Sequence, residues 1–185
     1  MSSFKTLAYK IVLVCLVAFP LHSKAGTDKE DQECEGVPFR VISAREYSSF
    51  PVWDQKISEK LYANIRSLEE YRKSFHGVFF PGTKSSPPES FFENKQILAV
   101  ALTMKAVAPE DWDRTFTVQK VENCGGHLSL YYKVNPMPSV ATWVQKNSLT
   151  VAIKKEAFDQ VSFVEEGQPV RVLEITQGQW RYPSL

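Results

Sequence analysis

The chain of 185 residues is 43% hydrophobic and 12% aromatic, a composition that excludes a disordered chain and is typical of a folded domain. Its 22 basic and 21 acidic residues nearly cancel, leaving a net charge of +1. Because no basic cluster is interleaved with aromatic residues, we expect neither nucleic acid nor an anionic membrane as a partner.

The first residues have the pattern of a secretory signal peptide. Lys5 and Lys10 supply positive charge, and Ile11–Leu21 form an apolar run that is too short to span a bilayer. The small residues Ser23 and Ala25 then suit cleavage after Ala25. We expect export to the periplasm or the extracellular space, with no stable membrane insertion after cleavage.

Three segments follow from this interpretation: a signal peptide over 1–25, a flexible acidic lead over 26–36, and a single domain over 37–185. Cys34 and Cys124 are the cysteines that remain after cleavage. An even number in an exported chain without a C-x-x-C motif favours a disulfide over a catalytic or metal-binding thiol. Such a bond would stabilise the fold by roughly 4 to 5 kcal/mol in the chain-entropy model.

Most of the domain is predicted to form short β-strands. The segment 94–107 contains an apolar run typical of a central strand buried on both faces. Gly125 and Gly126 allow a tight hairpin between two strands. The predicted strands are 37–43, 59–65, 94–107, 114–122, 127–134, 148–155, 160–166 and 168–176.

One amphipathic helix is predicted over 67–75. Ser67 and Glu70 have the spacing of a capping box at its start. The segment 108–114 is predicted to be a turn, and 135–139 a rigid loop rich in proline. Together these elements predict a mainly β (α+β) fold, an antiparallel β-sandwich or open barrel with one or two short helices.

The order of these segments resembles a known family. "NIRSLEEYRKSF", "PPESFFENKQILAVAL", "RTFTVQKVENCGGHLSLYYKVNPMP" and "SLTVAIKKEAFDQVSFVE" are similar to the PrcB-like domain family, the protease complex subunit type. The resemblance covers roughly Tyr47 to Glu165. It implies an exported accessory domain, associated in some cases with a cell-envelope protease complex, without an activity of its own. Two motifs depart from the family pattern. "WDRTF" stands where the family has a Gly-Gly pair that leads into the first hairpin strand. "SFFEN" stands where the family has the Asp of a "D-F" pair that begins the buried strand.

The residue types that carry catalysis are sparse. His76 falls at the end of the predicted helix, where it would cap the dipole, and His127 is predicted to be an exposed turn residue. No His, Cys and acid cluster has the spacing of metal ligands, and no nucleophile motif occurs. The acids near Asp113 are interpreted as a solvated turn. We expect no catalytic residue, no metal and no cofactor.

Two rigid loops carry candidate residues for binding a protein partner. Trp112 lies in "APEDWDR", and Met137 and Trp143 lie in "NPMPSVATW". An exposed apolar anchor on a rigid loop is what a binding module needs. It is equally consistent with the sequence that both tryptophans fold back to cover the core.

The function predicted from these observations is a non-enzymatic binding or assembly domain, an accessory subunit of an envelope protease complex. Two alternatives stay open: a secreted β domain that acts as a protease inhibitor, and a hydrolase whose carboxylate site has no recognisable motif. The partner is expected to be a protein, with a protease as the candidate that the resemblance suggests.

Overall fold

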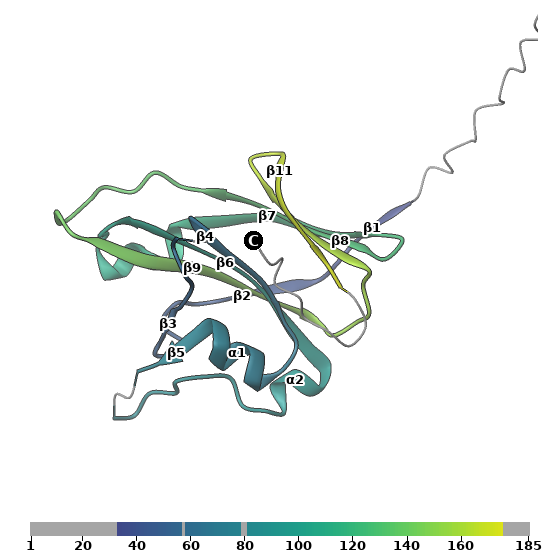
Figure 1. Ribbon diagram of the computed structural model, residues 1–185, viewed down its shortest axis with the longest axis horizontal. Helices are drawn as coiled ribbons and strands as arrows, with labels where there is room; N and C mark the ends of the chain where they lie inside the picture. Colours follow the sequence, from purple (N-terminus) through teal and green to yellow (C-terminus); the bar gives the residue numbers. More distant parts are fainter. Residues whose placement is uncertain (1–32, 57, 79–80, 176–185) are drawn as a thin grey trace, which may run out of the picture. The chain divides into compact units, whose positions relative to one another are not determined.

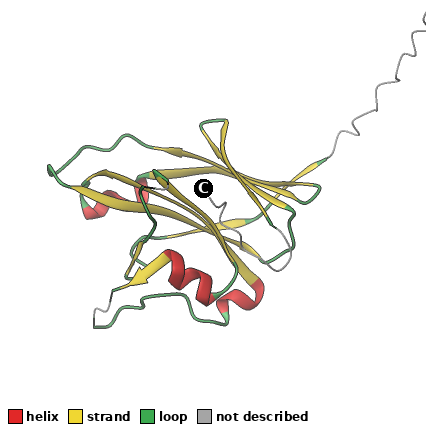
Figure 2. Ribbon diagram, viewed as in Figure 1, coloured by secondary structure: helices red, strands yellow, loops and turns green. Residues whose placement is uncertain are grey.

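The computed structural model describes residues 33–56, 58–78 and 81–175, which form a mainly β fold (Figure 1). Three short helical segments accompany the strands (Figure 2). The predicted fold class is confirmed, because two mainly antiparallel sheets pack face to face as a sandwich. The predicted signal peptide and most of the acidic lead lie outside the described residues. Among the residues that are described, no helix is long and apolar enough to cross a membrane.

Sheet A has five strands and forms one layer of the sandwich. Its neighbouring strands run antiparallel, except β8 and β10, which run parallel. The order across the sheet is β1 (Cys34–Gly36), β7 (Phe116–Cys124), β8 (His127–Val134), β10 (Gln160–Glu165) and β11 (Gln168–Glu174).

Sheet B has four antiparallel strands and forms the other layer. Two short strands, β3 (Ser49–Pro51) and β5 (Phe75–Gly77), pair separately. The helices α1 (Leu68–Ser74) and α2 (Phe91–Asn94) lie on the side of sheet B away from sheet A (Figure 1). The order across sheet B is β2 (Phe39–Ile42), β9 (Val144–Lys154), β6 (Lys95–Lys105) and β4 (Lys60–Ile65).

Strand β6 is buried on both faces, as its apolar run predicts. Leu98 and Val100 point into the core between the two sheets, which they share with residues of β8 and β10. Ile97 and Ala99 point the other way, into a second cluster with Tyr71 of α1. Because successive side chains of a strand alternate between faces, a strand covered on both sides needs apolar residues throughout.

Some element boundaries differ from the predictions. The predicted strand 37–43 is shortened to β2, and residues 34–36, at the end of the predicted flexible lead, form β1. The two strands belong to different sheets, and the chain crosses between them at Val37 and Pro38. Strand β9 begins four residues earlier than predicted, at Val144, because it pairs with β6 along its whole length. The predicted turn at 108–114 contains a 3₁₀ helix, η1 (Pro109–Arg114).

Helix α1 begins as predicted but ends earlier. The Ser67 side chain accepts a hydrogen bond from the Glu70 amide at 3.2 Å, while the Glu70 carboxylate accepts from the Arg66 amide at 2.6 Å. The second half of the capping box is therefore displaced by one residue. Phe75 leaves the helix to join β5, so the prediction that His76 caps the helix is wrong: it is an exposed residue of β5.

The hairpin between β7 and β8 carries the disulfide. Gly125 and Gly126 have φ angles of 57° and 89°, which fits a two-residue turn with left-handed backbone. Cys124 lies directly opposite Cys34 in the β1–β7 ladder, and the two form a disulfide. The predicted pairing is confirmed, and it joins β1 to the hairpin. Disulfides persist in non-reducing environments.

A partly buried polar cluster joins the two sheets. Lys60 of β4 lies 2.5 Å from Glu165 of β10, and the Tyr132 hydroxyl of β8 donates to the same carboxylate oxygen at 2.7 Å. Burial acts to raise the pKa of the Glu165 carboxyl, but the hydrogen bonds from Lys60 and Tyr132 outweigh it and hold that pKa below its usual value. The carboxylate is therefore charged near neutral pH and accepts both donors.

Candidate functional site

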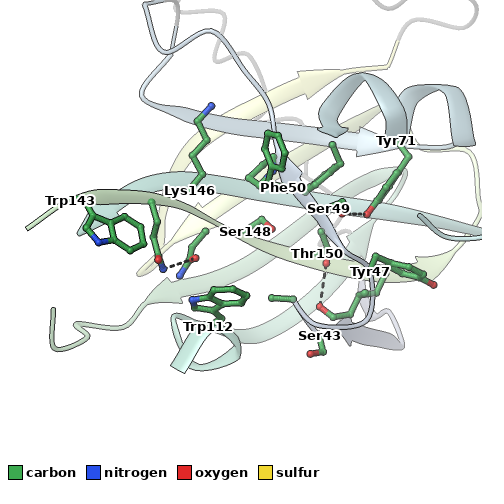
Figure 3. Close-up of a pocket in the computed structure, with 16 residues that line it drawn as sticks. Ser43, Tyr47, Ser49, Phe50, Tyr71, Trp112, Trp143, Lys146, Ser148 and Thr150 are labelled. Carbon is green, nitrogen blue, oxygen red and sulfur yellow. Dashed lines mark hydrogen bonds between the residues drawn. The ribbon is translucent and has the colours of Figure 1, made fainter. Parts of the chain in front are cut away.

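A groove of about 410 Å³ lies beside the first half of β9 (Figure 3). It is called the tryptophan groove below. One wall comes from η1 and the turn after β2, and the other from β3 and α1. The lining residues are Ile42, Ser43, Ala44, Tyr47, Ser49, Phe50, Pro51, Tyr71, Phe75, Trp112, Trp143, Gln145, Lys146, Asn147, Ser148 and Thr150.

The groove brings together two of the three predicted binding residues. Trp112 of η1 and Trp143, just before β9, both line it, although they come from loops that are separate in the sequence. The Trp143 side chain is 60% exposed. Trp112 is half-buried, and its indole N–H has no acceptor among the described residues. Met137 is half-buried and does not line the groove.

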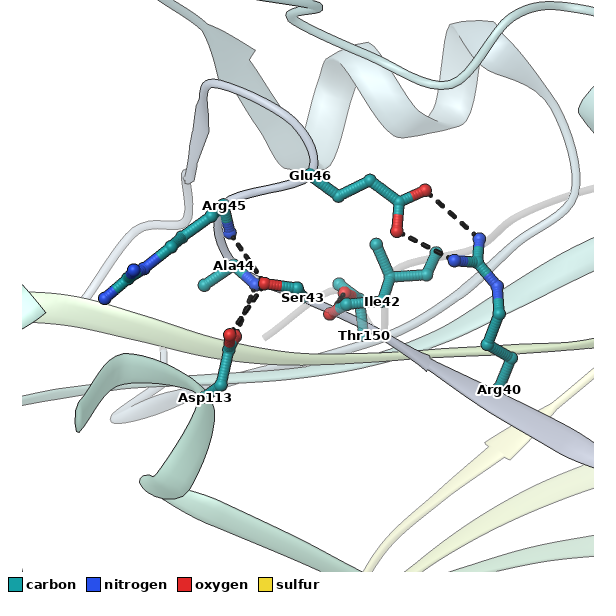
Figure 4. Close-up of polar contacts among 8 residues, drawn as sticks. All are labelled: Arg40, Ile42, Ser43, Ala44, Arg45, Glu46, Asp113 and Thr150. Carbon is teal, nitrogen blue, oxygen red and sulfur yellow. Dashed lines mark hydrogen bonds and ion pairs between the residues drawn. The ribbon is translucent and has the colours of Figure 1, made fainter. Parts of the chain in front are cut away.

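The wall that carries Trp112 is held by hydrogen bonds to Asp113 (Figure 4). One oxygen of this carboxylate accepts from the Ser43 hydroxyl at 2.6 Å, and the other from the Ala44 amide at 2.7 Å. The Ser43 hydroxyl in turn accepts from the Arg45 amide at 3.2 Å. Asp113 is exposed, in keeping with its interpretation as part of a solvated acidic turn, but it has a structural role that the sequence did not indicate. The side chain fixes η1 to the turn that follows β2.

The opposite wall is aromatic and uncharged. The rings of Tyr47 and Tyr71 meet edge to face, with centroids 6.4 Å apart, and the Tyr71 hydroxyl lies 2.8 Å from the Ser49 hydroxyl. Burial, followed by the neighbouring Glu46 carboxylate, raises the pKa of Tyr47 to about 12. Burial also raises the pKa of Tyr71. Both phenols are therefore neutral near pH 7.

The charged side chain that lines the groove is Lys146 of β9. Its ammonium lies 4.3 Å from the centroid of the Trp53 ring, within cation–π range. The groove thus combines aromatic walls, hydroxyl and amide groups, and one cation that is already in contact with a ring. Ligand sites in general combine apolar surface with a few polar groups. This lining therefore suits a mainly apolar ligand that also carries hydrogen-bonding groups.

Sequence reasoning missed the aromatic wall. Tyr47, Phe50 and Tyr71 have the ordinary pattern of core residues, and two of them are indeed mostly buried. Their role in the groove depends on β3 folding over β9, which is a long-range contact. The exposed Phe50, 45% exposed, stands in the segment "EYSSF" without any local feature that marks it as a wall residue.

His127 differs from its prediction as an exposed turn residue. It is half-buried, and its Nε2 lies 2.6 Å from the hydroxyl of Ser162 on β10. Serine hydrolases use such a contact between nucleophile and base. Ser162, however, is only 5% exposed in the middle of a strand, and among the described residues no carboxylate is hydrogen-bonded to the other ring nitrogen. The pair links β8 to β10 where these strands run parallel.

Among the described residues, no group of three or more His, Cys, Asp or Glu side chains could hold a metal ion.

Comparison of the chain with protein-family models, with curated proteins and with solved structures found no match.

Proposed function

We propose that this protein is an exported, non-enzymatic binding domain whose tryptophan groove holds part of a protein partner. The observation that carries the proposal is the convergence of Trp112 and Trp143 on one groove. Tryptophan is enriched among residues that dominate binding energy at protein interfaces. A side chain such as Trp143, exposed beside a concave aromatic surface, is suited to that role.

The wall is built in advance, which favours binding. Asp113 holds η1 against the turn after β2 through two hydrogen bonds, so the main chain that carries Trp112 is in place before any partner arrives. A preorganised surface loses less conformational entropy on association. The disulfide supports export, because such bonds persist in oxidising compartments. The resemblance to PrcB-like domains suggests an envelope protease complex as the partner.

Affinity capture from cell-envelope extract tests this proposal. The wild type is compared with a Trp112→Ala/Trp143→Ala variant, and with a Val170→Ala/Val172→Ala control. The two valines are exposed apolar residues of β11 that do not line the groove. We expect wild type and control to recover the same partner, and the tryptophan variant to lose it more than tenfold while unfolding at the same urea concentration.

Equal recovery by all three proteins would contradict the proposal. If a protease is captured, its activity with and without the purified domain separates two roles. Stabilised activity fits an accessory subunit, whereas loss of activity fits the alternative of an inhibitor.

A further inference from the structure

We propose that the tryptophan groove takes its ligand as an added β-strand. An extended segment of the partner pairs with the first half of β9, in line with β2, and places an apolar side chain against Trp112 and Trp143. This inference rests on the proposed function and specifies the form of ligand that the groove recognises.

The ladder between β2 and β9 covers only part of β9. On one side, β9 pairs with β6 from Val144 to Lys154. On the other side, β2 pairs with β9 only from Thr150 to Ile153. Within the described chain, residues 144–149 therefore have no strand partner on the side away from β6. This part of β9 is called the open edge below. An unpaired strand edge presents main-chain donors and acceptors that another strand can use.

The direction of these main-chain groups follows from hydrogen bonds at the two ends of β9. The main-chain amide of Ala106 donates to the Trp143 carbonyl at 3.0 Å, and the main-chain amide of Lys155 donates to the Asn94 carbonyl at 2.9 Å. The register between is continuous, and hydrogen-bonded and non-hydrogen-bonded pairs alternate in an antiparallel ladder. Odd-numbered residues of β9 therefore bond to β6. The residues of the open edge whose main-chain groups point away from β6 are Val144, Lys146 and Ser148.

The groove includes this edge as well as part of the outer face of sheet B. Gln145, Lys146, Asn147 and Ser148 are consecutive, and all four line the groove. Successive side chains of a strand point to opposite faces. A groove that touches four in a row therefore reaches around the edge of the strand.

Hydrogen bonds to Asp113 direct the chain away from the open edge after β2. Strand β2 ends at Ile42, and the next two residues, Ser43 and Ala44, are bound to Asp113 instead of to β9 (Figure 4). The chain then turns away to form β3 over the face of sheet B. A ligand strand would continue the β2 ladder past Ile42, beside the η1 wall.

The shape of the site favours a single extended segment over a second copy of this chain. Residues 145–148 of the open edge lie between the η1 wall and the β3 wall. Two copies that pair edge to edge would have to bring these walls into the same space. A free peptide strand has no such walls. Six residues of it, at about 3.4 Å each, would match the open edge over roughly 20 Å.

The unsatisfied donor of Trp112 supports a ligand with carbonyl groups. Its indole N–H is covered by protein and has no acceptor among the described residues. A buried donor without a partner is unfavourable. Rotation of the ring toward a main-chain carbonyl of the added strand would give this N–H an acceptor.

The test uses linear ten-residue peptides displayed on phage and selected against the purified, disulfide-bonded protein. A selected peptide is resynthesised with one N-methyl group at each position in turn, and its dissociation constant is measured. Only alternate residues of an added strand donate to the open edge. We expect N-methylation to weaken binding about three- to tenfold or more at every second residue of the contact segment, and little between them.

A second measurement examines the protein side of the ladder. Ser148→Pro removes an outward-pointing amide without touching a bond to β6, while Ser148→Ala removes only the hydroxyl. We expect the proline variant to bind the peptide at least threefold more weakly, and the alanine variant to bind like the wild type. If the proline variant does not fold, the N-methyl series decides alone.

The outcomes separate this inference from the proposed function. Binding that depends on Trp112 and Trp143, but without a period of two in the N-methyl series, would overturn strand addition and leave the proposed function standing. A period of two without dependence on the tryptophans would support strand addition and contradict the role of the tryptophans in the proposed function. Dimerisation through the groove in the absence of peptide would assign the edge to a second copy, and selection of no peptide would contradict both.

Discussion

Removal of the Cys34–Cys124 bond should destabilise the domain by a predictable amount. The bond joins residues separated by 90 positions. Closing a loop of this length lowers the entropy of the unfolded chain, which corresponds to about 4 to 5 kcal/mol near 25 °C. The double variant Cys34→Ala/Cys124→Ala restores that entropy to the unfolded chain.

Greater freedom of β1 in the folded state should offset part of this loss of stability. All three residues of β1 are exposed, so β1 can separate from β7 once the bond is absent. The separation should stop at Val37, which packs against the core between the sheets. Because a freed residue regains about 1 to 2 kcal/mol of backbone entropy, offset by its lost hydrogen bonds, we expect a net loss of roughly 2 to 4 kcal/mol.

Urea denaturation of three samples measures this loss: the oxidised wild type, the double alanine variant, and the wild type with reductant. The variant and the reduced protein should unfold at the same, lower urea concentration. Their m values should be higher than that of the oxidised protein, because an unfolded chain without the cross-link exposes more surface. Free energies of unfolding that agree within about 0.5 kcal/mol across all three samples would refute the reasoning.

Three further predictions concern single residues. Glu165 has a lowered pKa in the folded state, so its stabilising contribution should be complete above its ordinary pKa near 4.5 and disappear as the pH falls through the folded value. Glu165→Gln should lower the free energy of unfolding by about 1 to 3 kcal/mol at pH 7. Urea titrations at several pH values should show that the variant depends less on pH than the wild type. Ser67→Ala should lower the free energy of unfolding by about 1 kcal/mol through the lost N-cap, while an unchanged midpoint would contradict the capping assignment. Gly126→Ala should destabilise the hairpin, because Gly126 has a φ of 89° and an added Cβ would lie 2.9 Å from the Asp159 carboxylate; an unaltered melting temperature would count against this.

Much of the fold could be predicted because it depends on local patterns. The apolar run of β6, the glycine turn after Cys124 and the cap at Ser67 each act through neighbours in the sequence. The disulfide could be inferred from the count of cysteines remaining after the expected cleavage. The parallel pairing of β8 with β10 could not, because the segment 160–166 alternates like any strand, and its choice of neighbour depends on contacts distant in the sequence.

The candidate site was predictable only in part for the same reason. Trp112 and Trp143 stood out as large apolar residues on rigid loops, but their convergence depends on β9 and η1 meeting in the folded chain. Met137, in the same loop as Trp143, had an equal claim and lies elsewhere. The contribution of Asp113 was hidden because its partners, Ser43 and Ala44, are about seventy positions away.

The route of the chain between the two sheets has a consequence for the order in which the protein folds. After β8 in sheet A, the chain adds β9 to sheet B and only then returns to place β10 beside β8. Because the connection between β8 and β10 contains a strand of sheet B, completion of sheet A is linked to completion of sheet B. We expect the layers to form together in one cooperative transition. Folding should take milliseconds to seconds, as is usual where distant strands must find each other.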